Sequence, residues 1–414
     1  MTSTPTRQID VLVVGAGPAG SSAAAWLARQ GREVLLADSD EFPRDKPCGD
    51  GLTPRAIAEL RRLGIAEWVE NRTVNLGLRA NGFGQTLHLP WPGGSLPNYG
   101  SAAPRLVLDA KIREVALEWG AQTLDAAQAI DVEMKGDRIH AVIFKQYGST
   151  MRVEPKSVIV ADGARSQLGR LLGREWHRDT AYGVAARAYI SSERSDDKWI
   201  TSHLELRGTK NEILSGYGWI FPLGDGTVNI GVGTLATSKR PADVNLRHLL
   251  DFYAQGQRKE WQLSGEVQKP WSALLPMGGA VSGVAGKNWM LVGDAAGLVN
   301  PLNGEGIDYG LETGRLAAEY LAHNDKDFTE QWPNILRHHY GYAFSAARRI
   351  AGILTVPEVI KYAGPVGMRS RWLMGIALRV MGNLVTDEDK DALAHVWRGV
   401  GRASMLIDSR KPFS

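Results

Sequence analysis

Short continuous apolar runs alternate with helical periods in the first and last thirds of the chain. Four runs have the length and composition of strands buried on both faces, namely Ile9–Val14, Glu33–Ala37, Ser157–Ala161 and Trp289–Val292. Helices are expected after the first run as far as Gly31, and over Pro54–Leu63, Leu106–Trp119 and about Gly306–His323. Buried strands joined by helices in this way predict a parallel α/β sheet.

The middle of the chain follows a different pattern. Between about Thr180 and Trp271, alternating apolar and polar residues predict antiparallel strands at Tyr182–Ile190, Thr201–Leu206, Gly216–Pro222 and Thr227–Gly233. A helix is expected within this region over Asn245–Gln255, and the Gly-, Pro- and Trp-rich segment Ala80–Tyr99 is expected to form strands and turns.

These patterns predict an α/β (α+β) fold in which an antiparallel sheet domain is inserted into an interrupted Rossmann-like domain. The interrupted domain is expected to comprise residues 1–75, 105–178 and 275–330, and the inserted domain residues 76–104 and 179–274. Residues 331–414 are expected to form a helical region whose helices break at Pro357, Pro365 and Gly382.

A glycine-rich turn joins the first strand to the first helix. Its G-x-G-x-x-G pattern consists of Gly15, Ala16, Gly17, Pro18, Ala19 and Gly20. In a strand–turn–helix setting the three glycines allow a tight turn, the close approach of a pyrophosphate and the packing of helix on strand. The free N–H groups of the helix then favour an anion. Asp38, after the second strand, is expected to hold a ribose hydroxyl.

Three further motifs indicate which dinucleotide binds. Asp162 and Asp294 each follow a buried-type strand, and Pro301–Ile307 precedes a helix. A carboxylate such as Asp294 can accept hydrogen bonds from ribityl hydroxyls. The N–H groups of Gly304–Ile307 can face the flavin pyrimidine edge, where negative charge accumulates on reduction. Together the four motifs favour FAD, although each alone is also an ordinary turn at a strand end.

Composition and charge exclude several classes of protein. The single cysteine, Cys48, excludes an internal disulfide and a multi-cysteine metal site, and no metal is expected. Residues 1–8 are polar and no apolar run reaches about 18 residues, so neither a signal peptide nor a transmembrane helix is expected. The net charge of +3 does not favour nucleic acid as a partner. Residues 337–414 carry 12 Lys and Arg against 6 Asp and Glu, which suits an anionic membrane surface or an ordinary solvated helical face.

Two longer motifs point to a known family. The four flavin motifs resemble flavoproteins of the para-hydroxybenzoate hydroxylase fold, and Lys46–Leu52 and Gly216–Pro222 resemble the geranylgeranyl reductase family, which hydrogenates isoprenoid double bonds. Within that family the chain is most similar to the actinobacterial menaquinone reductases. This similarity extends through Asn229–Gly233 and Leu275–Gly279 to Arg410–Ser414.

The resemblance implies a set of FAD contacts. In the family the P-C-G loop passes beside the flavin, so Lys46 and Pro47 are also expected to contact FAD. The family's FAD contacts, carried over by position, are Ala19, Asp38, Cys48, Gly49, Gly51, Arg105, Ala129, Asp294, Gly306 and Ile307. Arg105 begins a helix and its guanidinium can neutralise flavin or pyrophosphate charge. Its alternative role is an ion pair with Asp109 at i+4.

Three residues are candidates for catalysis. Cys48 lies in the flavin loop and can donate a proton to the substrate or control access to the flavin, or it is a buried thiol without a chemical role. Tyr217 and Trp219 alternate onto one face of a strand, which the family resemblance places along the substrate cavity. They can pack an apolar chain against the flavin, with the phenol as a proton source, or they are an ordinary aromatic pair of a sheet core.

The function expected from the resemblance is the FAD-dependent reduction of an isoprenoid double bond, one isoprene unit of the menaquinone tail. This chemistry predicts a large apolar tunnel through the antiparallel domain. The alternatives are an aromatic monooxygenase or a halogenase of the same fold, and a non-catalytic flavin-containing isoprenoid carrier.

Two partners remain open at this stage. Gly278–Gly283 lacks a preceding strand, so no second nucleotide site is expected, and the electron donor is NAD(P)H or a redox protein. The apolar run Trp372–Leu378 is flanked by Arg369, Arg371 and Arg379. It can lie at a membrane interface or pack on the substrate domain. The protein is therefore expected in the cytoplasm, with the inner face of the cell membrane as a peripheral site.

Overall fold

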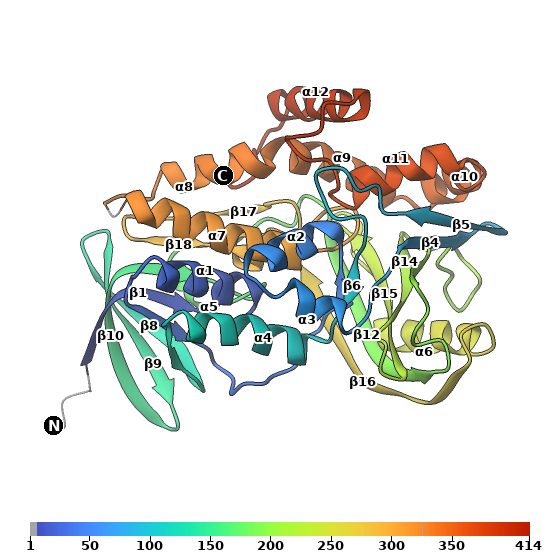
Figure 1. Cartoon of the computed structure of the whole chain (residues 1–414). Coiled ribbons are helices and arrows are strands. Elements are labelled where there is room, and N and C mark those ends of the chain that lie inside the picture. Colours follow the sequence, from blue (N-terminus) through green and yellow to red (C-terminus); the bar gives the residue numbers. More distant parts are fainter. Residues whose placement is uncertain (1–5, 325) are drawn as a thin grey trace.

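Two seven-stranded sheets lie side by side, with helices stacked over them. The structure, a computed structural model, describes residues 6–324 and 326–414, so part of the polar start from which we expected no signal peptide lies outside it. Figure 1 shows the first sheet at the left, the second at the right, and the last helices along the top. This arrangement confirms the predicted α/β (α+β) fold class.

The first sheet has the strand order β7-β2-β1-β10-β9-β8, and β18 pairs with β10. Its strands are β1 Thr6–Val14, β2 Val34–Ala37, β7 Gln122–Leu124, β8 Ala127–Lys135, β9 Arg138–Gln146, β10 Ser149–Val160 and β18 Trp289–Leu291. β1 runs parallel to both β2 and β10, with Leu12 opposite Leu35 and Val158. All three side chains are fully buried, as expected for parallel strands covered on both faces.

The helices over this sheet are α1 Pro18–Arg29, α2 Pro54–Arg62, α3 Ala66–Glu70, α4 Arg105–Glu118, α5 Gln167–Leu171 and α7 Ile307–His323. α1 and α7 approach each other closely because small residues meet at their contact. A Cβ on Gly314 of α7 would lie 2.3 Å from the carbonyl oxygen of Ala19. This close approach brings the N-terminal ends of two helices toward one region of the molecule.

The second sheet has the order β16-β12-β15-β14-β13-β4-β5. Its strands are β4 Gly77–Gly82, β5 Gln85–Pro90, β12 Tyr182–Ser192, β13 Trp199–His203, β14 Gly216–Pro222, β15 Thr227–Ala236 and β16 Leu263–Leu275. All its neighbours pair antiparallel except β13 and β4. Helix α6 Leu246–Gln257 covers one face with buried Leu249, Leu250 and Tyr253. Two short strand pairs lie outside the large sheets: β3 Gly51–Leu52 pairs with β6 Ser101–Ala102, and β11 Glu175–Trp176 pairs with β17 Val281–Ser282. A turn of 3-10 helix spans Gly293–Ala296.

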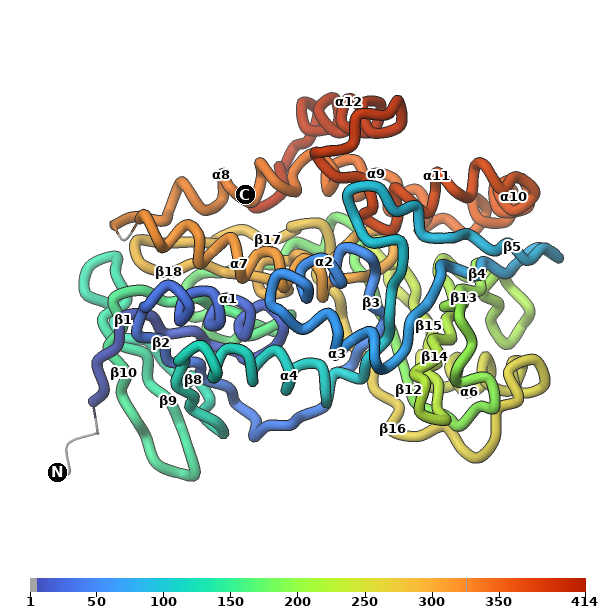
Figure 2. The backbone as a smooth tube through the Cα atoms, viewed as in Figure 1, coloured from blue at the N-terminus to red at the C-terminus, as the bar shows by residue number. Residues whose placement is uncertain are grey.

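The end of the chain is helical. Its helices are α8 Gln331–Leu336, a π-helical turn Arg337–Gly341, α9 Tyr342–Leu354, α10 Pro357–Met368, α11 Arg371–Met381 and α12 Ala392–Leu406. The trace runs back and forth above both sheets, and α12 lies outermost (Figure 2). No helix among the residues described combines the length and the apolar character needed to cross a bilayer.

The expected break at Pro365 is wrong. Pro365 lies inside α10, whereas Pro357 begins that helix and Gly382 follows α11, as predicted. An internal proline removes one backbone hydrogen bond and crowds the preceding turn. The exposed Lys361 at position i−4 can present its carbonyl to water, and the helix continues.

Candidate active site

The glycine turn has the backbone geometry that its pattern predicts. Gly15 has φ +102°, and a Cβ there would lie 2.3 Å from the carbonyl oxygen of Ala161 at the end of β10. A Cβ on Gly20 would lie 1.7 Å from the carbonyl oxygen of Gly15. Only glycine fits either position, so the turn brings strand and helix into direct contact.

Asp38 braces this turn from the neighbouring strand. Its carboxylate accepts hydrogen bonds from the backbone N–H groups of Ala16, at 2.6 Å, and Asp40, at 3.0 Å. The guanidinium of Arg44 lies 3.8 Å away. Asp38 also lines the cavity described below, at the end of β2 where a ribose is expected.

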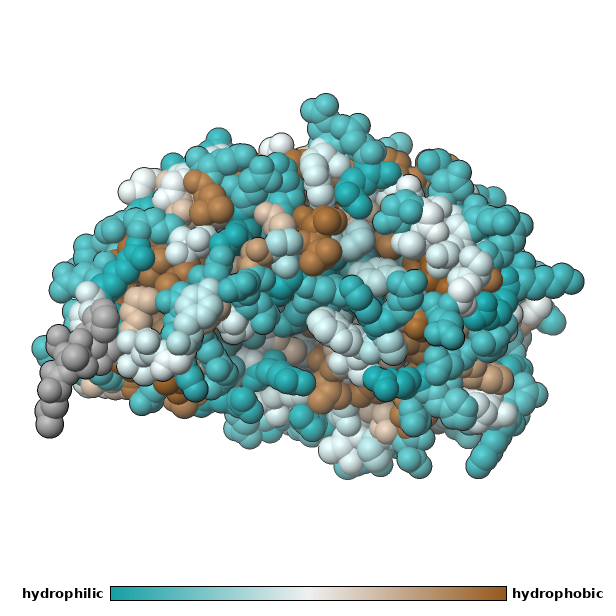
Figure 3. All heavy atoms as spheres, turned by 90° about the horizontal axis from the view of Figure 1, so that it is seen from below, coloured by the Kyte–Doolittle hydropathy of each residue, from teal (hydrophilic) through white to brown (hydrophobic). Residues whose placement is uncertain are grey.

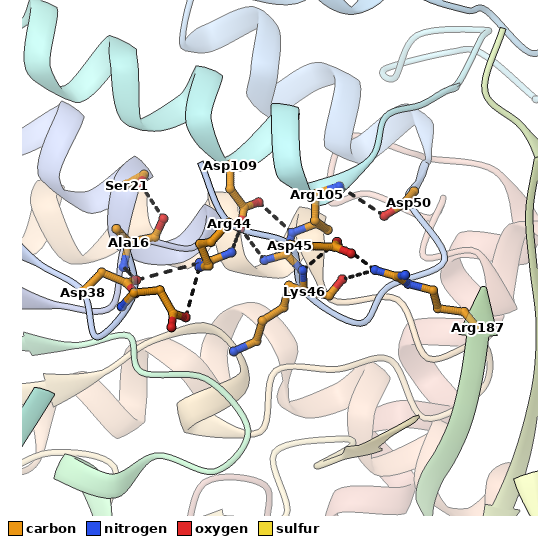
Figure 4. A network of polar contacts seen from close by, with 11 residues as sticks. Ala16, Ser21, Asp38, Arg44, Asp45, Lys46, Asp50, Arg105, Asp109 and Arg187 are labelled. Atoms are coloured by element: carbon orange, nitrogen blue, oxygen red, sulfur yellow. Dashed lines mark hydrogen bonds and ion pairs between the residues drawn. The ribbon is translucent and has the colours of Figure 1, made fainter. Parts of the chain in front are cut away.

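Two arginines converge over the N-terminus of α1. Arg44 and Arg105 both donate to the fully buried Asp109, Arg44 at 2.6 Å and Arg105 through two bonds of 2.6 and 2.8 Å (Figure 4). A Cβ on Gly17 would lie 3.6 Å from an Nη2 atom of each arginine. Burial disfavours the charge of Arg105, but Asp109 outweighs it and raises the pKa of Arg105 above its ordinary value. Arg105 therefore pairs with Asp109, as one of its two alternatives predicts, and it also lines the cavity. Its role toward a cofactor stays a prediction.

This region suits an anionic dinucleotide. Gly17 begins α1 and no side chain caps it, so the first N–H groups of the helix are free to bind a ligand. Arg44 and Arg105 share Asp109 here, so two guanidinium groups lie beside these free donors. Backbone donors and guanidinium groups together are the usual partners of a pyrophosphate.

A second helix N-terminus faces the same space. α7 begins after Gly306, again without a side-chain cap. The Asp294 carboxylate lies beside Gly306, with Oδ1 3.1 Å from where a Cβ would be. Burial raises the pKa of Asp294, against the opposing effects of Arg105 and Lys46, and burial lowers the pKa of Lys46. The two ends of a long cofactor could thus lie near α1 and α7.

Asp162 has a mainly structural environment. Its carboxylate accepts hydrogen bonds from the Ser166 hydroxyl, at 2.6 Å, and the backbone N–H of Leu168, at 2.8 Å. The carboxylate thus holds the start of α5. Asp162 and Ala129 both line the cavity, so their backbone N–H and carbonyl groups are the groups available to a ligand.

A single cavity of about 1860 Å³ collects nearly all the residues predicted from the sequence. Gly20, which packs between helix and strand, is the exception. The predicted residues that line the cavity are Gly15, Gly17, Pro18, Ala19, Asp38, Lys46, Pro47, Cys48, Gly49, Gly51, Arg105, Ala129, Asp162, Tyr217, Trp219, Asp294, Gly304, Gly306 and Ile307. The volume exceeds the roughly 300–1,000 Å³ of ordinary ligand pockets.

The cavity continues from these polar residues into an apolar region. Its apolar lining comes from the second sheet and from α9–α11, and includes Leu78, Phe83, Leu89, Trp91, Ile200, Leu204, Phe221, Leu354, Val359, Ile360, Met368, Met374, Leu378 and Met381. Space for a cofactor and for a long apolar ligand is therefore continuous.

Three aromatic rings on β14 form an aromatic wall of the cavity. Tyr217, Trp219 and Phe221 project to one face, with ring centroids 5.9 and 6.3 Å apart in sequence order. A Cβ on Gly49 would lie 3.3 Å from Trp219 Nε1, and one on Gly51 3.0 Å from Phe221. The predicted shared face of Tyr217 and Trp219 is confirmed, and it packs on the loop that carries Cys48.

A buried polar network holds that loop in place. Asn229 on β15 donates to the carbonyl of Cys48 and to Asp50 Oδ2, both at 2.8 Å, and accepts from Trp219 Nε1 at 2.9 Å. The Tyr189 hydroxyl donates to the same Asp50 oxygen at 2.7 Å. Burial, opposed by these donors, raises the pKa of Asp50 to about 6.

Cys48 is a protonated thiol in this setting. Its sulfur accepts a hydrogen bond of 3.3 Å from the backbone N–H of Asp50. Burial and the Asp50 carboxylate raise the pKa of Cys48 to about 11. The thiol is therefore neutral at physiological pH and is a weak acid.

Sequence reasoning missed five polar residues of this site. Asp50 and Glu305, which line the cavity, stand inside quoted motifs, and so does Asn229; Arg44 and Tyr189 complete the set. The signal for the two acids was their position between two glycines in segments assigned to the flavin. For Asn229 the motif gave no role, and for Arg44 and Tyr189 only the fold shows the contact. Figure 4 shows a further such link, in which Arg187 reaches Asp45 and Lys46 from β12.

With this geometry established, comparison with known proteins assigns the family. Residues 8–221 match the family model described as FAD binding domain. The chain is 59% identical over 407 residues to the menaquinone reductase of Mycolicibacterium smegmatis, covering 98% of this chain and 99% of the relative. It is 58% identical over 405 residues to that of Mycobacterium tuberculosis, covering 98% of each.

The chain belongs to the menaquinone reductase family. Members of this family are FAD-dependent oxidoreductases, and FAD is the cofactor that the cavity accommodates. The chain also has more distant relatives. One is digeranylgeranylglycerophospholipid reductase 1 of Methanopyrus kandleri, which is 28% identical to this chain over 87% of this chain and 95% of the relative.

Solved structures show the same fold at lower sequence identity. A geranylgeranyl bacteriochlorophyll reductase-like protein from Thermoplasma acidophilum superposes with a TM-score of 0.75 at 20% identity, covering 95% of this chain and all of the other. A flavin-dependent brominase superposes with a TM-score of 0.73 at 20% identity, covering 96% and 98%. At this level of identity, these two likenesses concern the fold alone.

Proposed function

We propose that this protein uses FAD to saturate one isoprenoid double bond in the tail of menaquinone. The observation that carries the proposal is the continuity of the FAD-type cleft with an apolar cavity bounded by the second sheet and α9–α11. The relatives named menaquinone reductase, at 58–59% identity over almost the whole chain, support the same substrate.

The residues have distinct proposed roles toward the cofactor. Gly15–Gly20, Arg44 and Arg105 would hold the pyrophosphate, Asp38 the ribose, and Asp294 the ribityl chain. The N-terminus of α7, from Gly304 to Ile307, would face the flavin. Bound FAD supplies hydride transfer, the chemistry that no side chain can provide.

The protein's own groups would position the substrate and exclude water. An isolated alkene is a poor hydride acceptor, so it must be held closely in a dry site. Tyr217, Trp219 and Phe221 offer an apolar wall for this purpose, and Asn229 fixes both Trp219 and the Cys48 loop. We assign β4, β5 and β12–β16 to the substrate-binding part on this basis.

Rival activities fit this cavity less well. An aromatic monooxygenase or a halogenase acts on a compact ring, and neither needs the long apolar extension toward α10 and α11. The likeness to the brominase, at 20% identity, concerns the fold alone. A carrier without catalysis would bind the lipid and leave its mass unchanged.

Anaerobic reduction of the bound lipid tests the proposal. The FAD-loaded protein is reduced with dithionite, incubated with menaquinone and reoxidised, so that quinol is returned to quinone before mass spectrometry. A gain of two mass units supports saturation of one bond. An added oxygen, or an unchanged lipid with fully reduced flavin, would contradict it.

We further propose that α10 and α11 rest on an anionic membrane. Met368 is the buried residue of α10 and Leu378 that of α11. Tyr362 and Trp372 are 70% and 73% exposed on these helices. Residues 357–381 contain four basic side chains and one acidic side chain. Other residues of both helices line the cavity, so a lipid tail could enter beside them.

The side of the molecule opposite α10 and α11 offers a control surface. The face seen from below, on the side of β16 and α6, is mostly hydrophilic, with apolar groups in small separate patches (Figure 3). Flotation with phosphatidylglycerol vesicles tests the orientation. Tyr362→Glu combined with Trp372→Glu should abolish binding, whereas Phe252→Glu on α6, where Phe252 is 44% exposed, should not. Equal flotation of both variants would refute this surface.

A further inference from the structure

An acidic residue, Glu305, lines the cavity just before the start of α7. Glu305 lies between two glycines and lines the cavity near Tyr217, whose hydroxyl donates to the carbonyl of Asn303. The Thr53 hydroxyl donates to Glu305 Oε1. Oε2 has the Asn303 amide at 3.4 Å, a weak interaction. The Glu305 carboxyl therefore receives little of the hydrogen bonding that an anion needs.

Charged neighbours also act on its ionisation. Asp308, fully buried in the first turn of α7, disfavours the charge of Glu305, and Arg55 is the cation that favours the charged form of both acids. Arg55 is otherwise engaged, since it donates to the carbonyls of Asn383 and Val385 and lies 3.5 Å from Glu312. Tyr217 and Tyr309 are further titratable groups close enough for the charge of Glu305 to act on them. Burial, and after it Asp308, raise the pKa of Glu305 well above its ordinary value.

Asp308 itself does not face the cavity. Its Oδ2 accepts from the Asn383 amide at 3.1 Å, and its Oδ1 has no hydrogen-bond partner among the residues described. A buried orphan oxygen of this kind indicates that the pair of acids holds at least one proton. Between the two, Glu305 is the residue that lines the cavity.

The other acids of the site are less suited to giving a proton. The Asp50 carboxylate accepts from Tyr189, Asn229 and the backbone of Arg105, which favours its charged form. The Cys48 thiol is a very weak acid, as shown above. The Tyr217 hydroxyl already gives its hydrogen to Asn303.

We propose that Glu305 is the general acid that protonates the substrate alkene. The inference rests on the proposed function. In the step, the π bond breaks, one carbon takes the proton of the Glu305 carboxyl, and the other takes a hydride from the cofactor reduced by the electron donor. The saturated bond and a Glu305 carboxylate result, and the carboxylate recovers its proton from water after the product leaves.

Kinetics of single variants test the role. Glu305→Gln keeps the shape of the side chain but has no acidic proton, and kcat should fall about 100-fold, the lower end of what general acids contribute. Wild-type kcat should fall as the pH rises through the pKa of Glu305, and this limb should vanish in the variant. Glu319→Gln, 53% exposed on the same helix, is the matched control. A loss below tenfold, or a retained limb, would overturn the proposal.

A spectroscopic readout separates acid from scaffold. The infrared carbonyl band of a protonated carboxyl should be present in the FAD-loaded wild type at neutral pH, absent in Glu305→Gln and shifted in Glu305→Asp. If Glu305→Gln lowers activity but the wild type shows no such band, Glu305 is ionised and the proposal fails. Unchanged flavin absorbance of the variants verifies that they fold and hold FAD.

The two levels of proposal fail differently. If the wild type leaves menaquinone unreduced, the proposed function is wrong whatever the infrared spectrum shows. If the wild type reduces the lipid and Glu305→Gln does so at a similar rate, the function stands and the assignment of Glu305 is wrong.

Discussion

Replacing Asn229 by alanine should loosen the flavin loop and the aromatic wall together. Asn229 is fully buried and makes three hydrogen bonds, to the Cys48 carbonyl, to Asp50 and to Trp219. A neutral buried bond contributes about 1 kcal/mol and one to a carboxylate about 2 kcal/mol. The expected loss in the free energy of unfolding is therefore about 4 kcal/mol.

Urea unfolding of the FAD-loaded protein, followed by tryptophan and flavin fluorescence, measures this loss. The same substitution at Asn71, an exposed residue after α3, should change the free energy of unfolding by less than about 0.5 kcal/mol. Asn229→Ala should also slow lipid reduction, because Trp219 and the Cys48 loop lose their common anchor. A loss below about 1 kcal/mol with normal reduction would refute this reasoning.

Three further outcomes follow from the site. Gly20→Ala should abolish FAD binding, since its Cβ would lie 1.7 Å from a backbone oxygen, while Gly256→Ala, with open space around it, should bind FAD normally in a fluorescence titration. Arg44→Gln should weaken FAD binding about 10- to 100-fold in the same titration, because this is the range expected for the loss of one charge-assisted hydrogen bond. Lys239→Gln, at an exposed residue, should leave FAD binding unchanged. Because the pKa of Cys48 is raised from 9.0 to about 11, its thiolate forms only at higher pH. Alkylation of Cys48 by iodoacetamide at pH 8 should therefore be about 100-fold slower in the native protein than in the urea-unfolded protein. Equal rates would contradict the burial of the thiol.

The sequence predicted well those features that depend on local rules. The glycine turn, the strand that precedes it and the helix that follows are predicted from residues 9–31 alone. The contact of Gly20 with Gly15 lies within this segment, whereas the contact of Gly15 with Ala161 comes from the fold. The face shared by Tyr217 and Trp219 follows from the two-residue period of a strand.

The polar contacts between distant segments could not be read in this way. Asn229 meets Cys48 across 181 positions of the chain, and this meeting depends on how the second sheet packs against the loop. Asp109 had been considered as a partner of Arg105, but its second bond, to Arg44, spans 65 positions. At Pro365, solvent exposure of the helix outweighed the local rule against proline.

Reduction in deuterated water tests the central claim most directly. The FAD-loaded protein, menaquinone and dithionite are incubated without oxygen in deuterium oxide, and the lipid is reoxidised and fragmented in the mass spectrometer. Both hydrogens added to the alkene should come from solvent, since the hydride position of reduced flavin exchanges with it. The product should carry two deuterium atoms on neighbouring carbons of one isoprene unit. An undeuterated tail, or a product that contains additional oxygen, would contradict the claim.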